Sequence, residues 1–182
     1  MSKFTIDKLK FCEADGKEIA EFLADNFHKE HSFSINGKSP KLHWGRVSHK
    51  INSVLLDGVV FVVRDEDGNI VGSVGLEETD HWWSNENFLG DSWFYVLPKH
   101  REIADGEKPS NLLLKTAMAY AKEKNKPIVM GIYNITSIEK AEKLFFKNGF
   151  HKIGGTYYND CLLYTSDAAD EGLGVDLGGR RI

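Results

Sequence analysis

Two β-branched segments separated by a short polar turn constrain the fold of this chain more than any other feature. Residues 59–64 read VVFVVR and residues 70–76 read IVGSVGL, and such runs are typical of buried strands. The segment between them, DEDGN, contains Gly68, which can supply the positive φ that a tight turn needs. The sequence therefore predicts an antiparallel hairpin in the first half of the chain.

The rest of the chain predicts strands that alternate with helices. The expected strands cover residues 3–11, 93–97, 128–133 and 150–158, and the expected helices are one capped by Asp15, one starting at Ser39-Pro40, and those over 112–124 and 137–147. Gly149 is expected to end the last helix, and residues 79–90 to form a polar and aromatic loop. The order β-α-α-β-β-β-α-β-α-β predicts an α/β (α+β) domain with a mixed sheet and helices on both faces.

Composition excludes several classes of protein and partner. The chain is 41% hydrophobic and 27% charged, which is typical of a folded domain. Its net charge of -4 gives no general attraction for nucleic acid or for an anionic membrane. No apolar run approaches membrane-spanning length, residues 1–20 carry no signal-peptide pattern, and two cysteines cannot build a disulfide framework. We therefore expect a cytoplasmic protein with no nucleic-acid and no membrane partner.

The last residues differ in composition from the rest. Residues 161–182 read CLLYTSDAADEGLGVDLGGRRI, with several glycines and no apolar periodicity. Residues 161–170 and 175–182 resemble the in-frame translation of a transposase-based sequencing adapter, with a variable index between them. We therefore expect one domain over residues 1–160, of metagenomic origin, and a disordered non-native tail over 161–182. The natural C-terminus beyond Asp160 is then not given by this sequence.

One stretch in the second half favours an anion site. Val96-Leu97-Pro98-Lys99-His100-Arg101 leads through a loop with Gly106 to a helix that opens near Pro109. The first N–H groups of a helix have no partner within it, and its dipole favours an anion. Because Arg101 can bind an anion with two hydrogen bonds, a phosphate or pyrophosphate ligand is one interpretation. A plain connection with a surface arginine is the other.

A second stretch, Ala141-x-x-Leu144-Phe145-x-x-x-Gly149-Phe150, lets the two interpretations be weighed. Together the two stretches resemble the GCN5-related N-acetyltransferase superfamily, with motifs V-x-P-x-x-R/Q-x-x-G-x-G/A and A-x-x-L-Y-x-x-x-G-F. The resemblance covers roughly residues 4–160 and is closest to short members carried by phages. The matching residues are Val96, Pro98, Arg101, Ala141, Leu144, Gly149 and Phe150.

The resemblance implies an acetyl-CoA-dependent N-acetyltransferase. It implies a mostly antiparallel sheet of about six or seven strands, in which the strand through Val96 splays from the strand over 128–133. The pantetheine arm of acetyl-CoA would lie in the gap, and the N–H near Val96 would stabilise the oxyanion. The implied cofactor-binding residues are Val96, Leu97, Pro98, Arg101, Gly106, Lys108, Ser110, Asn111 and Asn134. Asn134 has the alternative role of capping the next helix. The acceptor would be an amine of a small molecule or a peptide, no metal is implied, and the protein would be a monomer or homodimer.

The chain departs from the family pattern at two places. Three extra residues separate Arg101 from Leu112, and the G-x-G/A pair is reduced to Gly106, with Pro109 offering no N–H. Phe145 stands where the family often has a tyrosine that protonates the departing thiolate. Either water or a nearby tyrosine takes that role, or the thiolate leaves unaided, or activity is low. Tyr133, Tyr157 and Tyr158 are the candidate tyrosines, with packing as their alternative role. These departures favour an alternative function, a non-catalytic acyl-CoA-binding domain.

Candidate general bases and other polar features have open interpretations. The acids nearest the expected strand ends, Glu77, Glu78 and Asp91, are each a candidate general base or a surface carboxylate. His28 and His31 have helical metal-ligand spacing without a third ligand, which favours solvent-facing histidines. Trp82, Trp83 and Phe88 are expected either to line an acceptor pocket or to cover the sheet edge.

Overall fold

The computed structural model describes residues 4–31, 40–102, 107–132 and 138–154. Internal contacts divide the chain into one unit of residues 1–32 and 41–152 and a second of residues 33–40 and 153–182. Only residues 40, 153 and 154 of the second unit are described, so the fold below is that of the first unit. The expected tail over 161–182 lies outside the described residues.

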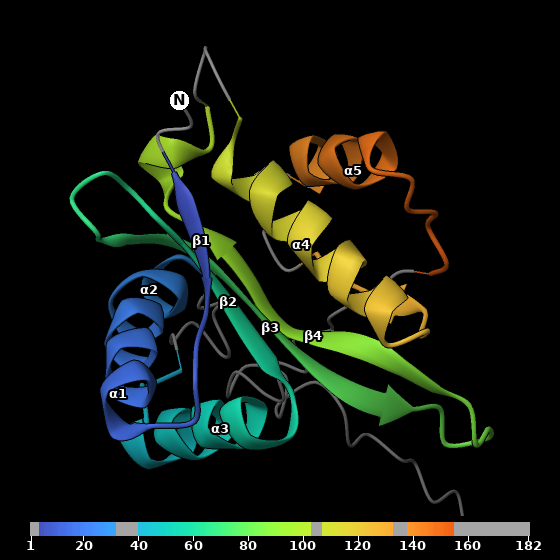
Figure 1. Ribbon diagram of the computed structural model, residues 1–182, viewed down its shortest axis with the longest axis horizontal. Coiled ribbons are helices and arrows are strands. Elements are labelled where there is room, and N and C mark those ends of the chain that lie inside the picture. The colour runs from blue at the N-terminus through green and yellow to red at the C-terminus, as the bar shows by residue number, and fades with distance from the viewer. Residues whose placement is uncertain (1–3, 32–39, 103–106, 133–137, 155–182) are drawn as a thin grey trace, which may run out of the picture. The chain divides into compact units, whose positions relative to one another are not determined.

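A single mixed sheet forms the centre of this unit (Figure 1). In the described part of the chain it has five strands in the order β1-β2-β3-β4-β5. They are β1 (Thr5–Lys8), β2 (Val59–Arg64), β3 (Ile70–Asp80), β4 (Asn87–Val96) and β5 (Ile128–Val129). The first four pair antiparallel, and β5 runs parallel to β4. The prediction of a mixed, mostly antiparallel sheet is confirmed.

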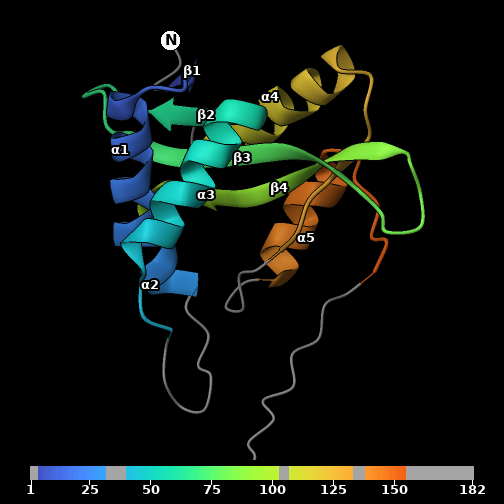
Figure 2. The same ribbon diagram turned by 90° about the horizontal axis from the view of Figure 1, so that it is seen from below.

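Helices cover both faces of the sheet, as the sequence predicts (Figures 1 and 2). They are α1 (Glu13–Phe22), followed by a π-helical segment (Leu23–Phe27) and α2 (His28–His31), then α3 (Trp44–Asp57), α4 (Pro109–Glu123) and α5 (Ile138–Lys147). Alternate residues of β2 face opposite ways, so Val60 and Val62 pack with α1 and α3 while Val59, Phe61 and Val63 pack with α4. This alternation explains why β2 reads as an unbroken apolar run.

The central hairpin and the last helix stop are confirmed. Gly68, in the turn between β2 and β3, has a φ of 83°, and Gly149, after α5, has a φ of 84°. At the end of α5 the N–H of Phe150 donates to the Phe145 carbonyl (3.1 Å) and that of Gly149 to the Phe146 carbonyl (3.0 Å). These two bonds form the helix-ending motif that favours glycine at this position.

Two predicted helix starts are wrong. Cys12, not Asp15, occupies the N-cap position of α1, because the Asp15 carboxylate instead accepts a hydrogen bond from the Lys10 N–H (2.6 Å). The second helix starts at Trp44 rather than at Ser39-Pro40, and Ser39 itself lies outside the described residues. His43 caps this helix, since its Nδ1 accepts from the Arg46 N–H (3.3 Å).

The predicted loop over 79–90 is also wrong. Strands β3 and β4 continue through most of it, with Thr79 paired to Phe88 and Asp80 to Asn87. Cross-strand pairing outweighs the polar composition, and only residues 81–86 form the connection.

In the described residues, the last two predicted strands do not extend over their expected ranges. β5 covers 128–129 rather than 128–133, and residues 150–154 are not a strand. Residues 155–158 lie outside the described part of the chain. The described residues therefore contain five strands where about six or seven were expected.

Candidate functional site

The ladder between β4 and β5 ends early and leaves a gap. The parallel pairs are Leu89 with Ile128 and Gly90 with Val129, and none follows them in the described residues. β4 nevertheless continues to Val96, and the other chain segment continues through residues 130–132. We call the space between residues 92–96 and residues 130–132 the β4–β5 gap. Strand edges without a ladder partner present backbone hydrogen-bonding groups to which an extended ligand can bind.

The backbone of Val96 faces the β4–β5 gap. The Leu97 N–H donates to the Val71 carbonyl of the β3 side (2.9 Å), and alternation along an antiparallel ladder then turns the N–H and C=O of Val96 to the opposite edge. The Val96 carbonyl on that edge accepts a hydrogen bond from Nε of Arg101 (2.7 Å). The N–H of Val96 is thus presented to the gap while its carbonyl is occupied.

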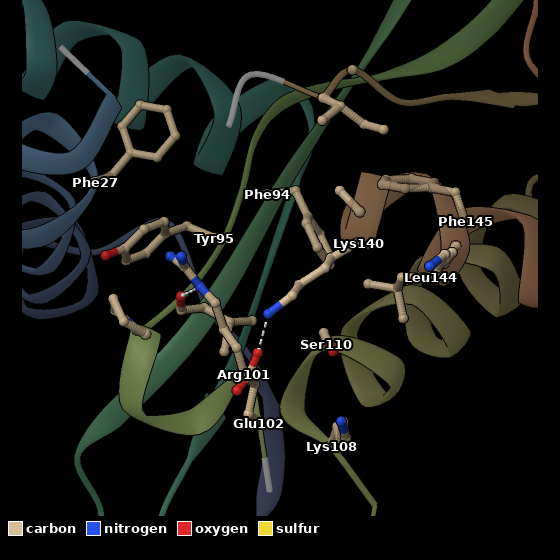
Figure 3. Close-up of a pocket in the computed structure, with 16 residues that line it drawn as sticks. Phe27, Phe94, Tyr95, Arg101, Glu102, Lys108, Ser110, Lys140, Leu144 and Phe145 are labelled. Carbon is tan, nitrogen blue, oxygen red and sulfur yellow. Dashed lines mark hydrogen bonds and ion pairs between the residues drawn. The ribbon is translucent and has the colours of Figure 1, made fainter. Parts of the chain in front are cut away.

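A cavity of about 510 Å³ opens beside the gap (Figure 3). Both sides of the gap line it, together with the start of α4 and one face of α5. Its lining residues are Phe27, Phe94, Tyr95, Val96, Pro98, Arg101, Glu102, Lys108, Ser110, Gly131, Ile132, Lys140, Ala141, Lys143, Leu144 and Phe145. The cavity has the size of a small-molecule site, with apolar walls and a few polar groups.

The start of α4 offers one backbone donor and follows directly after Lys108. Pro109 has no N–H, and the N–H groups of Asn111 and Leu112 donate to the Lys108 carbonyl (3.0 and 3.1 Å). Within the first turn this leaves the N–H of Ser110 as the donor without a carbonyl partner inside the helix.

Three lysine side chains line the cavity. Lys108 directly precedes α4, and Lys140 extends from α5 (Figure 3). Lys143, also on α5, lines the same cavity. Lys140 forms an ion pair with Glu102, which also lines the cavity. A helix N-terminus beside several ammonium groups favours a bound anion.

Arg101 is engaged by a carboxylate of this chain. Both guanidinium ends bind Glu30 at the end of α2, one through Nη2 to Oε2 (2.7 Å). The Tyr95 hydroxyl donates to the same carboxylate (2.9 Å), and the guanidinium lies over the Tyr95 ring (5.3 Å). Burial, followed by these bonds to Glu30, raises the pKa of Tyr95 above its ordinary value. The side chain of Arg101 therefore anchors α2 and the end of β4, and its guanidinium is already occupied.

Phe145 forms an apolar wall of the cavity. Its side chain is 6% exposed and contacts the rings of Phe94 (6.0 Å between centroids) and Phe150 (5.1 Å). No hydroxyl therefore occupies the position at which the family motif has a tyrosine. Tyr95, the tyrosine among the lining residues, has its hydroxyl on Glu30.

The three candidate carboxylates lie in different environments, and none of them lines the cavity. Burial alone raises the pKa of Glu77, but hydrogen bonds from Lys50, Ser92 and Ser53 outweigh it and hold that pKa below its ordinary value. An ion pair with Lys126 likewise lowers the pKa of Glu78.

Asp91 differs from both glutamates. Burial raises the pKa of Asp91 to about 6, although backbone N–H groups of Gly131 and of Asp91 itself partly oppose the rise. Its Oδ1 accepts from the Gly131 N–H (2.7 Å), and its buried Oδ2 has no hydrogen-bond partner in the described residues. Asp91 is thus placed at the closed end of the β4–β5 gap, and it contacts the cavity-lining Gly131.

The structure brings together a part of the predicted cofactor site. Val96, Pro98, Arg101, Lys108 and Ser110 all line the cavity. Leu97 and Asn111 are described but do not line it: the Leu97 N–H bonds to Val71, and the Asn111 side chain bonds to Asn148 of the segment after α5 (3.3 Å). Gly106, Tyr133 and Asn134 lie outside the described residues, as do Tyr157 and Tyr158.

Sequence reasoning missed several lining residues. They are Phe27, Phe94, Tyr95, Glu102, Gly131, Ile132, Lys140 and Lys143. For the two lysines a signal was present, because Lys140, Lys143 and Leu144 are three and four residues apart and so share one face of α5 with the motif leucine. Phe27 gave no such signal, because it comes from a distant segment of the chain.

The remaining sequence features form no second centre. The described residues contain no group of three or more His, Cys, Asp or Glu side chains able to hold a metal ion. Trp82 and Trp83 lie in the 81–86 connection, 92% and 65% exposed, and neither lines the cavity, while Trp83 stacks on His81 (4.5 Å). Within the described segments, no helix is both long and apolar enough to cross a membrane.

Comparisons with known proteins bear on the fold. No protein-family model and no curated protein matches this sequence. A ribosomal-protein-alanine N-acetyltransferase from Brucella melitensis has a similar structure, with a TM-score of 0.58, 18% identity, and coverage of 86% of this chain and 97% of that one. An aminoglycoside acetyltransferase from an uncultured soil metagenomic sample has a TM-score of 0.60 and 15% identity, with coverage of 87% of this chain and 98% of that one. A predicted acetyltransferase from Clostridium acetobutylicum, solved with acetyl-CoA, has a TM-score of 0.63 and 14% identity, with coverage of 86% of this chain and 96% of that one.

These similarities extend over most of each chain. At such low identity they show a common fold and not a common substrate. The chain has the fold of known acetyltransferases, so the expected mixed, mostly antiparallel sheet with helices is confirmed, whereas the expected six or seven strands are not.

Proposed function

We propose that this protein is an N-acetyltransferase that moves an acetyl group from acetyl-CoA to a primary amine of a small molecule or peptide. The observation that carries the proposal is the β4–β5 gap, with a cavity at its open end and a lysine-rich helix start beside it. An extended, phosphorylated thioester requires this combination of an unpaired strand edge and an anion site. The similar acetyltransferase from Clostridium acetobutylicum was solved with acetyl-CoA, which supports the same choice of acetyl donor for this chain.

The phosphate end of acetyl-CoA would bind at the start of α4. The Ser110 N–H would donate to the pyrophosphate, and the ammonium groups of Lys108 and Lys143 would neutralise its charge. Arg101 would contribute through position, since it holds the Val96 carbonyl and leaves the Val96 N–H for the substrate. Leu97 and Pro98 begin the turn that connects Val96 to Arg101. Gly106, Asn111 and Asn134 remain proposed contacts of acetyl-CoA.

The reaction would be a direct transfer. The lone pair of the amine attacks the thioester carbonyl carbon, a C–N bond forms, and the C–S bond breaks with its electron pair leaving on sulfur. The Val96 N–H faces the gap and would stabilise the negative charge on the carbonyl oxygen. The amine proton must pass to a base, and the thiolate must take a proton or leave as the anion.

The proton carriers remain proposals. Asp91 and Tyr133 are the candidates closest in the chain to the two edges of the gap, whereas Glu77 and Glu78 would first have to release Lys50 and Lys126. Phe145 cannot protonate the thiolate. This last observation supports the second candidate function, an acyl-CoA-binding domain without catalysis.

Steady-state acetyl transfer separates these two functions. The full chain is mixed with acetyl-CoA and a panel of amines, including a polyamine, an aminoglycoside and a lysine-containing peptide, and released thiol is measured. Thiol release that depends on one amine, together with an acetylated product of the expected mass, supports the enzyme. Coenzyme A binding without any transfer supports the binding domain, and neither binding nor transfer would refute both.

A further inference from the structure

The side chain of Asp91 stands where the β4–β5 ladder stops. In the ladder the Leu89 N–H donates to the Pro127 carbonyl (2.9 Å), and the two observed pairs require the Val129 N–H to donate to Leu89 and the Asp91 N–H to donate to Val129. A parallel ladder that continued would next join the Gly131 N–H to the main-chain carbonyl of Asp91. That pair is absent.

The Gly131 N–H is instead taken by the Asp91 carboxylate, through Oδ1 (2.7 Å). The side chain thus intercepts the donor that the main chain of the same residue would otherwise bind. With this N–H engaged by a side chain, the main-chain bond that would hold the two backbones at the regular sheet spacing of about 4.8 Å is not made.

The register of β4 supports this role. A register shift occurs between Gly75 and Leu76 of β3, opposite Trp93 and Asp91, so Ser92 is an extra residue in β4. Such a bulge bends its strand locally and re-aims the neighbouring side chains. The pairing of Asp91 with Leu76, whose side chain packs in the α4 cluster, places Asp91 on the side of the sheet that faces α4.

We propose that Asp91 is a positioning residue that ends the β4–β5 ladder by capturing the Gly131 N–H and so keeps the gap open for the pantetheine arm of acetyl-CoA. This inference rests on the proposed function and adds to it the residue that shapes the site. In this role Asp91 acts through Gly131, whose N–H its Oδ1 accepts, and needs no contact with the reacting atoms.

The test compares three variants of the full chain: Asp91→Ala, Asp91→Asn and, as a matched control, Asp80→Ala. Asp80 is an exposed carboxylate on the neighbouring strand and does not line the cavity. Alanine removes the side-chain acceptor and lets the Gly131 N–H return to the main-chain carbonyl, whereas asparagine keeps an oxygen at the same place. Coenzyme A affinity is measured by titration calorimetry, and the Gly131 amide is followed by NMR across a pH titration.

We expect Asp91→Ala to weaken coenzyme A binding on the order of tenfold, which corresponds to the contribution of about one hydrogen bond. Asp91→Asn and Asp80→Ala should stay within about threefold of the original affinity. The Gly131 amide shift should follow the carboxylate titration in the unaltered chain and stay constant in Asp91→Asn.

Unchanged affinity in Asp91→Ala would overturn the inference, and so would a Gly131 amide that does not titrate in the unaltered chain. Failure of the proposed function gives a different result, in which no variant binds coenzyme A while the Gly131 amide still titrates with Asp91. That result would leave Asp91 as the residue that ends the ladder and would remove the substrate from the proposal. A folded Asp91→Ala, checked by its thermal unfolding, is expected because the change removes a buried charge.

Discussion

Replacing Asp91 with asparagine should change how the stability of the protein depends on pH. Burial raises the pKa of this carboxyl from 3.8 to about 6. Because the folded state holds the proton more tightly than the unfolded state, the buried carboxylate destabilises the fold fully above pH 6, and this cost disappears as the pH falls toward 3.8. At about 1.36 kcal/mol per pH unit, the full cost is about 3 kcal/mol.

The asparagine side chain carries no charge at any of these pH values and keeps an oxygen for the Gly131 N–H. The free energy of unfolding of Asp91→Asn should therefore exceed that of the unaltered protein most at about pH 7.5, and the difference should shrink by about 2 to 3 kcal/mol at about pH 4. Urea unfolding followed by circular dichroism at several pH values measures this directly.

Other carboxylates do not obscure the comparison. Glu77, Glu78 and Glu102 have pKa values below their ordinary ones, so their stabilisation is lost as the pH falls, and it is lost equally in both proteins. Asp80→Asn makes the same change at an exposed carboxylate on the neighbouring strand and serves as the control. A difference between Asp91→Asn and the unaltered protein that is the same at both pH values would refute the reasoning.

Three further predictions concern packing, the end of β4 and catalysis. In Gly75→Ala the new Cβ would lie 2.6 Å from the Trp93 ring, so urea unfolding should show a loss of about 1 to 3 kcal/mol; a neutral effect would contradict this packing. Arg101→Lys loses the two-point contact with Glu30, so thermal unfolding and coenzyme A titration should both show weakening, and unchanged values would contradict the anchoring role. Phe145→Tyr should raise acetyl transfer if a missing acid limits turnover, measured by thiol release; an unchanged rate with a functional enzyme would show that protonation of the thiolate is not limiting.

Elements that depend on local geometry were predictable from the sequence. The β2–β3 turn and the end of α5 each need a positive φ, and Gly68 and Gly149 are the residues that adopt it. The apolar run of β2 likewise predicts a buried strand, and the structure confirms it and shows that both faces of β2 are covered. The motif residues Val96 and Pro98 could be placed at the cavity because the strand-to-helix connection is itself local.

Features set by distant residues could not be predicted. Arg101 looks like an anion ligand in its own segment, yet its partner Glu30 is 71 positions away in the chain. The early end of β5 depends on a side chain 40 positions before Gly131. The extension of β3 and β4 through residues 79–90 depends on their pairing with each other, which a polar composition does not reveal.

Titration of the full chain with coenzyme A tests the central claim most directly. The account predicts saturable binding with a Kd on the order of micromolar to submillimolar, about fivefold weaker in Lys143→Ala and unchanged in Lys147→Ala, the matched lysine on α5 that does not line the cavity. The absence of any heat of binding at millimolar coenzyme A would contradict the assignment of this cavity as the site for the phosphorylated thioester. The assignment would also be contradicted if Lys143→Ala, Lys147→Ala, Lys108→Ala and the unaltered chain all bound coenzyme A with the same affinity.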